Sequence, residues 1–363
     1  MNDTFRLGRI VGVRVGVNWT VLVVFTLLAY GLGAERLPQS YKGLHPVIYV
    51  LGGLVTAAAF LASLLAHELA HAIVARRNGL TVEGITLWLL GGVARFEGEP
   101  DSPGAELRIA GSGPLVSLLL GMLLAGASAV LLIADLNGMV AGCLAWLAAI
   151  NVVLALFNVI PAAPLDGGRL VHALLWRLSG DRTKATLRAA AAGRGFGWIA
   201  MVAGFYVSLW TFSGLWLILI GWFLITAAGM EAGQARALAR LDGITIGRIM
   251  TPDPFTVPGS MTAAEFTREM LPRHRHTAYP LIDDGVVRGI VRAERIGEQE
   301  AGAPIGAVVE DAERTGAETP LTDLLPRLAR ERLLVFEAER LIGIVTPRDL
   351  ARTLEHLPAD PTK

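Results

Sequence analysis

The feature that most constrains the fold of this chain is a set of long apolar runs, all of which lie before residue 232. A helix needs roughly 20 apolar residues to cross the ~30 Å hydrocarbon core of a bilayer. Six such runs can be drawn, at 15–33, 47–76, 108–134, 139–160, 196–212 and 214–230. The sequence therefore predicts a multi-pass α-helical membrane protein, with about six transmembrane helices in residues 1–232.

The composition agrees with this interpretation. Of the 363 residues, 53% are hydrophobic and 18% are charged, whereas soluble domains carry about 25% charged residues. The formal net charge is zero, so charge gives no argument for a nucleic-acid partner. Cys143 is the only cysteine, which excludes an intrachain disulfide and a metal site built from cysteines.

Basic residues indicate how the spans are oriented. With a cytoplasmic amino terminus, the outside segments hold only Arg36 and Lys42. The inside segments then hold Arg6, Arg9, Arg14, Arg76, Arg77, Arg95, Arg169, Arg177, Arg182, Lys184, Arg188 and Arg194. Because basic residues gather on the cytoplasmic side of membrane proteins, we expect both termini inside. The short chain has no organelle-targeting pattern, so we expect a bacterial plasma membrane.

Three ionisable residues interrupt the second run. His67, Glu68 and His71 follow the order H-E-x-x-H, and such residues at membrane depth are costly enough to indicate function. On a helix, His67 and His71 share one face and can hold one metal ion. Glu68 can then act as general base on a water molecule. A hydrolytic zinc site also needs a third protein ligand and an open fourth position.

The third ligand is sought in the segment "LFNVIPAAPLDGGRLVHALLW", 156–176. Its two prolines break the fourth run, and Asp166 follows them at the same predicted membrane face, with Gly167-Gly168 permitting a sharp turn. Asp166 is the best candidate, although it could instead cap a helix, and His172 competes with it. Asn158 could bind a substrate backbone or bridge two helices.

A second unusual connection, "TVEGITLWLLGGVARFEGEP" at 81–100, alternates as a β-hairpin does. Gly91-Gly92 is the predicted turn, with a possible role in substrate binding. A hairpin next to a span can enter the membrane only where protein or a water-filled cavity covers its backbone. We therefore expect a membrane-associated hairpin.

After a predicted linker at 233–243, the chain becomes charged and reads as two weak copies of one unit, 244–297 and 304–356. Each copy has a helix-like run, a strand, a turn and a G-I-V strand, which suggests a pseudo-twofold pair. "IMTPDPFTVP" and "GIVTPRDL" are similar to the CBS-domain family, an α/β fold whose pairs often bind adenine nucleotides. The resemblance places ribose contacts at Thr346 and Asp349. The alternative is a purely structural or dimerising pair, which would allow a homodimer.

The membrane part resembles the site-2 protease family of intramembrane zinc metalloproteases. "HELAH" in one span and "NVIPAAPLDGGR" at the end of a later one carry the resemblance. It implies one zinc ion held by His67, His71 and Asp166, with Glu68 as catalytic base. It also implies that "GITLWLLGGVARF" presents the substrate, because an exposed strand edge can pair with an unwound substrate segment.

Two functions follow from these patterns. The first is an intramembrane protease that cuts a single-span membrane protein, such as a membrane-tethered transcription regulator, under control of the CBS pair. The second is an ion transporter or channel with a CBS regulatory tail, in which the histidines line a cation pathway. A transporter of that kind would be expected to show a duplicated helix set, and "HELAH" has no echo in the other spans.

Overall fold

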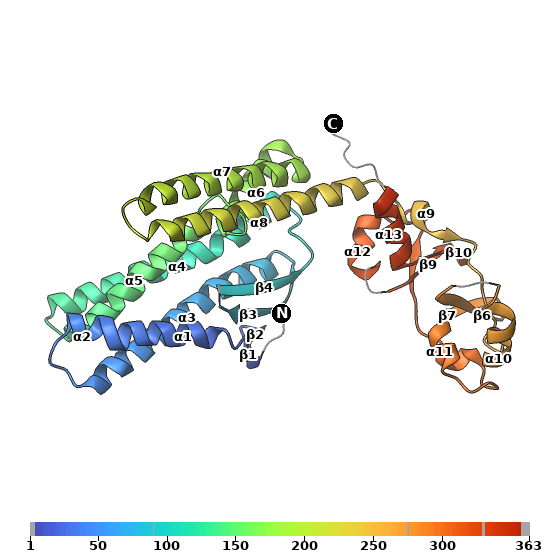
Figure 1. Cartoon of the computed structure of the whole chain (residues 1–363), viewed down its shortest axis with the longest axis horizontal. Coiled ribbons are helices and arrows are strands. Elements are labelled where there is room, and N and C mark those ends of the chain that lie inside the picture. The colour runs from blue at the N-terminus through green and yellow to red at the C-terminus, as the bar shows by residue number, and fades with distance from the viewer. Residues whose placement is uncertain (1–3, 90, 274–275, 329–330, 357–363) are drawn as a thin grey trace. The chain divides into compact units, whose positions relative to one another are not determined.

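The structure is a computed structural model that describes residues 4–89, 91–273, 276–328 and 331–356. The chain forms two compact units, Met1–Ala235 (unit 1) and Arg236–Lys363 (unit 2), both drawn in Figure 1. The division falls where the apolar part of the sequence gives way to the charged part.

Unit 1 consists of long helices and one small sheet. Its helices are α1 (Val21–Tyr30), the π-helix η1 (Gly31–Arg36), α2 (Leu37–Ser40), α3 (Pro46–Arg77), α4 (Pro103–Ile133), α5 (Gly138–Asn158), α6 (Asp166–Ser179), α7 (Arg182–Ser208) and α8 (Gly214–Leu241). Its strands are β1 (Phe5–Ile10), β2 (Val13–Val17), β3 (Thr81–Trp88) and β4 (Gly91–Glu97). Because α4 packs against α3, α5 and α6, it is the central helix of the unit.

Five helical stretches in the described residues are long and apolar enough to cross a membrane. They are Val21–Ser40, Pro46–Arg77, Pro103–Ile133, Gly138–Asn158 and Gly214–Leu241. The remaining predicted span, 196–212, falls largely in α7, which begins earlier than predicted and carries basic residues along its first half. The expected fold class, a multi-pass helical membrane protein, is confirmed.

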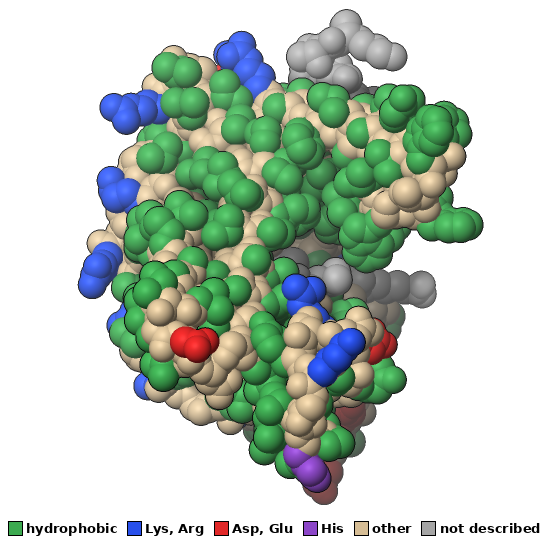
Figure 2. Space-filling view, turned by 90° about the vertical axis from the view of Figure 1, so that its left-hand side faces the viewer, with side chains coloured by type: hydrophobic (Ala, Val, Ile, Leu, Met, Phe, Trp, Pro, Cys, Tyr) green, Lys and Arg blue, Asp and Glu red, His purple; other side chains and the backbone are tan. Residues whose placement is uncertain are grey.

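The side chains of unit 1 are distributed as in a protein surrounded by lipid. Small residues fill the contacts between helices, and Ala57, Ala72 and Ala110 are fully buried. Large apolar side chains point outward instead, with Ile133 87% exposed and Phe212 91% exposed. Figure 2 shows hydrophobic side chains over most of one face of the molecule. Since lipid is as apolar as leucine, close packing through small residues holds such helices together.

The sheet of unit 1 has the strand order β1-β2-β3-β4. The pairs β1–β2 and β3–β4 are antiparallel, and β2–β3 is parallel. One face of the sheet packs on α3, where Val13, Ile85 and Leu87 belong to one buried cluster with Ala72. Residues 15–17 therefore belong to a strand, and the first span begins at Val21 rather than at 15. The alternation of valine over 13–17 has the period of a strand, which the length of the apolar run concealed.

Strands β3 and β4 form the hairpin expected within 81–100, but the glycine pair has a different place in it. Gly91 pairs with Trp88 and Gly92 pairs with Leu87, so both glycines begin β4. The prediction of a turn at Gly91-Gly92 is therefore wrong, and the chain reverses between Trp88 and Gly91.

Unit 2 is built from short helices and strands. Its helices are α9 (Ile246–Ile249), α10 (Ala263–Glu265), the π-helix η2 (Phe266–Met270), α11 (Ala293–Gly297), the 3-10 helix η3 (Ile305–Val308), α12 (Leu321–Leu328) and α13 (Pro347–His356). Its strands are β5 (Thr251–Pro252), β6 (Ala278–Asp283), β7 (Val286–Arg292), β8 (Glu313–Gly316), β9 (Leu333–Glu337) and β10 (Arg340–Val345). As the two predicted copies require, β6 pairs with β7 and β9 pairs with β10.

The segment predicted as a linker, 233–243, is helical as far as Leu241 because α8 continues beyond its apolar part. The residues there, "GQARALARL", are mostly strong helix formers, so intrinsic propensity extends the helix. Strand β5, from the first copy, pairs with β10 of the second, so the two copies share one sheet of order β5-β10-β9-β8.

Candidate metal centre

Helix α3 positions the two histidines of the H-E-x-x-H motif. His67 and His71 lie one helical turn apart on the buried face of α3, with 3% and 6% of their surfaces exposed. Their rings meet edge to face, with centroids 4.9 Å apart. Because the rings share one face, both Nε2 atoms point to the same place, as the spacing predicted.

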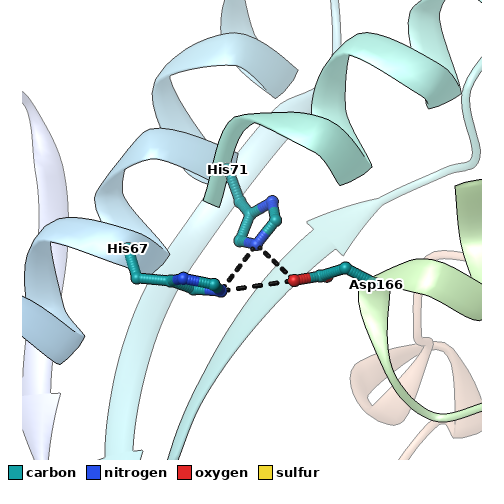
Figure 3. Close-up of side chains that lie close together, drawn as sticks. All are labelled: His67, His71 and Asp166. Carbon is teal, nitrogen blue, oxygen red and sulfur yellow. Dashed lines mark hydrogen bonds and ion pairs between the residues drawn. The ribbon is translucent and has the colours of Figure 1, made fainter. Parts of the chain in front are cut away.

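The carboxylate of Asp166 completes a triangle of possible ligand atoms (Figure 3). Its Oδ2 lies 3.2 Å from His67 Nε2 and 3.1 Å from His71 Nε2, and the two nitrogens are 3.2 Å apart. Tetrahedral zinc with ligand bonds of about 2.0–2.1 Å separates its ligand atoms by about 3.3 Å. The triangle therefore has the size, the donor atoms and the three-ligand composition of a hydrolytic zinc site.

Helix α4 holds the outer nitrogens of both histidines. His71 Nδ1 donates to the carbonyl oxygen of Ile109 at 2.7 Å, and His67 Nδ1 lies 2.9 Å from Ser117 Oγ. A carbonyl only accepts, so the proton of a neutral His71 is on Nδ1 and the lone pair is on Nε2. Such outer hydrogen bonds fix the tautomer and the ring orientation that metal binding requires.

The same face of α4 also leaves room for the rings. A Cβ atom at Gly113 would lie 2.1 Å from His71 Nε2 and 2.6 Å from His67 Nε2, so only glycine fits there. Ile109, Gly113 and Ser117 are spaced four residues apart, which places all three on one side of the helix. Sequence reasoning missed this side of the site, because small residues in a transmembrane helix are equally typical of close helix packing.

Asp166 reaches the histidines because the chain breaks between α5 and α6. Helix α5 ends at Asn158, and Asp166 is the first residue of α6. The glycines that follow allow close approach rather than a turn: a Cβ at Gly167 would lie 2.2 Å from the Ile160 carbonyl oxygen, and one at Gly168 would lie 2.8 Å from Ala162. The L-D-G-G sequence therefore packs the start of α6 against the broken segment and directs Asp166 at α3.

The electrostatics of the triangle favour an ionised aspartate. Burial would raise the pKa of Asp166, but hydrogen bonds and charge from His67 and His71 outweigh burial and lower the pKa to about 2. Metal ligands bind in their deprotonated form. Asp166 is therefore a carboxylate at neutral pH, ready to hold a cation.

Glu68 lies next to the triangle and under the hairpin. It is half-buried, within electrostatic range of the three ligand residues. A Cβ at Gly92 would lie 2.2 Å from Glu68 Cγ, so the backbone of β4 approaches this side chain directly. One of the two glycines proposed for substrate binding is thus in contact with the proposed base.

His172 does not join the triangle, so the alternative that it is a ligand is wrong. Its Nδ1 lies 2.8 Å from Glu106 Oε2 of α4, and its Nε2 lies 3.1 Å from Thr186 Oγ1 of α7. Burial would lower the pKa of His172, but the hydrogen bond and charge of Glu106 raise it above its ordinary value. The pair ties α6, which carries Asp166, to α4, which orients the histidines.

The other predicted site residues lie elsewhere. Asn158 is half-buried at the end of α5 and donates from Nδ2 to the carbonyl oxygen of Leu154 at 3.1 Å. In unit 2, Asp349 is buried at the start of α13, where Thr346 donates to its Oδ2 from the backbone nitrogen at 3.0 Å and from Oγ1 at 2.7 Å. Thr251 and Arg352 donate to Oδ1.

The fold and the site define a class: a membrane-embedded metallopeptidase followed by a small α/β domain. Residues 55–135 and 128–203 match Peptidase family M50, and residues 246–296 and 311–356 match the CBS domain. Relatives match over nearly the whole chain. A protein from Mycobacterium tuberculosis called "Putative zinc metalloprotease Rip3" is 39% identical over 98% of this chain and 94% of its own length.

A zinc metalloprotease from Methanocaldococcus jannaschii is 30% identical over 98% of each chain. The solved structure of a site-2 protease from the same organism is 28% identical, with a TM-score of 0.40 over 63% of this chain and 94% of that one. The chain belongs to peptidase family M50, the site-2 proteases, and is a zinc metalloprotease with a carboxy-terminal CBS pair. These relatives are proteases, and they give the transporter alternative no support.

Proposed function

We propose that this enzyme cuts a peptide bond inside a transmembrane segment of a single-span membrane protein, such as a membrane-tethered transcription regulator. The observation that carries the proposal is the triangle of His67, His71 and Asp166 with Glu68 beside it, two of whose ligands lie in a membrane-spanning helix. A hydrolytic centre in that place can act on a substrate that is itself in the membrane.

The chemistry requires one zinc ion per chain, held by His67, His71 and Asp166. Zinc bound by three such ligands is a Lewis acid that makes water nucleophilic near neutral pH and polarises a carbonyl. Glu68 takes a proton from the attacking water and passes it to the leaving amine as the peptide C–N bond breaks. Ile109 and Ser117 keep both imidazoles aligned meanwhile.

Strand β4 is suited to hold the substrate in an extended form. It is an edge strand of the described sheet, because its only partner in the strand order is β3. Its first residues lie against Glu68 through Gly92. An unwound substrate segment that adds to this edge would present its peptide bonds beside the base, with Gly91, Gly92 and Asn158 as candidate contacts.

The test is a Glu68→Gln variant, reconstituted with a co-expressed single-span substrate. We expect cleavage to fall roughly 10²–10⁴-fold, as when general acid–base catalysis is lost, while one zinc ion per chain remains. Glu35→Gln, which changes an exposed carboxylate outside the triangle and outside the hairpin, is the matched control. Cleavage by Glu68→Gln at the normal rate would refute the mechanism.

We further propose that the CBS pair adjusts proteolysis, that both termini are cytoplasmic in a bacterial plasma membrane, and that the chain can form a homodimer. Basic residues support the orientation, and the CBS match supports the regulation. An adenine nucleotide is the candidate effector, with Thr346 and Asp349 at the ribose. Calorimetry of the full chain with ATP, ADP and AMP tests this, since no heat with any of them would leave a structural role.

A further inference from the structure

Four arginines lie on one face of the amino-terminal sheet. In β2, the valines at 13, 15 and 17 alternate with Arg14 and Gly16. Because Val13 faces the core against α3, Arg14 and Gly16 lie on the opposite, outer face of the sheet. Arg9 pairs with Arg14, and Arg6 pairs with Gly16, so both share this outer face. In β3, Thr86 pairs with Gly16, so Gly84, two residues earlier, also lies on the outer face. Arg95 of β4 pairs with Gly84 and therefore shares that face.

A bulge makes this arrangement possible. Residues three apart on a regular strand point to opposite faces, but the register of β1 shifts between Arg6 and Gly8, which returns Arg6 to the side of Arg9. Gly8 has a φ of +107°, in the left-handed region that favours glycine. The glycine therefore sets the bulge, and the bulge gathers the arginines.

The outer face is hollow where the arginines meet. Arg6, Arg9, Arg14 and Arg95 line a pocket of about 540 Å³, together with Glu83 and Gly84. Glu83 Oε2 lies 3.9 Å from Arg95 Nε, which partly balances the charge of that arginine. Among the described residues no ion pair is recorded for Arg6, Arg9 or Arg14, so the pocket carries an excess of positive charge. Gly8 and Gly84 also line the pocket and add no side chain to it, so its volume has room for a group the size of a phosphate.

The pocket lies at the end of several membrane-spanning helices. Strand β2 ends at Val17 and the first span begins at Val21; α3 ends at Arg77 and β3 begins at Thr81. The turn between β1 and β2 contacts the end of α3, where Arg76 Nη1 donates to the carbonyl oxygen of Val11 at 2.8 Å, so this end of the sheet lies where the headgroup region begins. Phe5, Leu7 and Trp19 are more than half exposed around the sheet, as apolar and aromatic side chains are at membrane interfaces.

We propose that this pocket binds the phosphate of an anionic membrane lipid headgroup. Guanidinium groups form paired hydrogen bonds with phosphate oxygens, and the apolar side chains around the sheet favour a ligand whose tails remain in the bilayer. The sheet also carries β4 at its other edge, so lipid binding would anchor the strand that approaches Glu68. The inference rests on the membrane location of unit 1 and not on the proposed proteolysis.

The experiment counts lipid bound to the purified full chain by native mass spectrometry. The probes are dioleoyl phosphatidylglycerol, dioleoyl phosphatidylcholine and inorganic phosphate. Arg9→Gln with Arg14→Gln is the test variant, and Arg77→Gln with Arg188→Gln is the control. The control removes two exposed arginines of the same predicted membrane side, outside the pocket. Arg6→Gln serves as a milder variant should the double substitution fail to fold.

We expect phosphatidylglycerol to bind wild type and control in preference to phosphatidylcholine, and to bind the test variant about tenfold more weakly. Equal phosphatidylglycerol binding by the test variant and the wild type would refute the proposal that this pocket binds the lipid. Equal binding of both lipids by the wild type would refute it as well. Displacement of the lipid by equimolar inorganic phosphate would assign the pocket to free phosphate and overturn the lipid. Zinc content serves as the folding check.

Discussion

Each of the two units of this protein holds a cluster of polar side chains around one aspartate, half-buried Asp166 in unit 1 and buried Asp349 in unit 2, and the two clusters differ in which ligand atoms remain available. At the metal centre, the outer nitrogens of the histidines are bonded to α4, while His67 Nε2, His71 Nε2 and Asp166 Oδ2 face one another. In unit 2, both oxygens of Asp349 already accept hydrogen bonds from threonine or arginine donors. The first cluster therefore offers ligand atoms to a metal ion, whereas the carboxylate oxygens of the second already have hydrogen-bond partners within the protein.

The difference teaches that a motif indicates metal binding when its ligand atoms converge on one another instead of each accepting from a separate donor. With the proton of His71 on Nδ1, its Nε2 and Asp166 Oδ2 are both acceptors 3.1 Å apart, so a proton or a cation must lie between them. Asp349 has the geometry of a helix-start residue whose loss costs stability whether or not a nucleotide binds.

The largest effect is expected for Asp166→Asn, which removes one corner of the triangle. An amide is a poor zinc ligand, so zinc measured by mass spectrometry of metals should fall from one ion per chain to about 0.1 or less. Asp349→Asn in unit 2 should leave zinc unchanged. Full zinc content in Asp166→Asn would show that the aspartate is not a ligand and would erase the contrast between the clusters.

Gly113→Ala should come next, because the new methyl group would lie between the two imidazoles. We expect zinc affinity, measured by competition with a chelator, to fall by about 100-fold. Gly126→Ala on the same helix has nothing within 4 Å of its Cβ and is the matched control. Unchanged affinity in Gly113→Ala would mean that the rings can move aside without losing the metal.

Ser117→Ala removes only an outer hydrogen bond to His67 and should act more weakly. Loss of such a partner lowers metal affinity about 10–100-fold, and we expect the lower end because the His71–Ile109 bond remains. The control is Ser128→Ala, which removes a buried serine of α4 that donates to Ala141 and not to the site. Equal zinc affinities in the two variants would show that Ser117 does not support the metal centre.

The smallest effect is expected in unit 2. Asp349→Ala should destabilise this unit by about 1 kcal/mol, through loss of the bonds at the start of α13, as measured by denaturant unfolding without nucleotide. The exposed Asp311→Ala is the control, expected within about 0.5 kcal/mol of wild type. No stability change, together with lost nucleotide heat, would make Asp349 a ligand residue and reverse the comparison.

The sequence predicted the parts of the site that depend on local periodicity. His67 and His71 had to share a face because they are four residues apart on a helix, and the prolines before Asp166 had to break a span. The α4 contribution could not be predicted in this way. A backbone carbonyl such as that of Ile109 has no sequence signature, and a glycine such as Gly113 is equally typical of ordinary helix packing.

The fold showed the same limits. Spans were predictable because lipid demands length and apolarity, whereas the short strands ahead of the first span were hidden at its start. The place of Gly91 and Gly92 depended on pairing with β3, which turn preferences alone did not determine. The competition between Asp166 and His172 was resolved by tertiary contacts, because His172 is held by Glu106, 66 positions away, and by Thr186, while Asp166 contacts both histidines.

The ligand triangle joins chain positions that are far apart: Asp166 lies 95 residues beyond His71. An ion held there therefore closes a large ring of polypeptide that contains the hairpin, α4 and α5. Removing such an ion would open that ring and release the start of α6 from α3, so a bound metal would also act as a reversible cross-link within the active site.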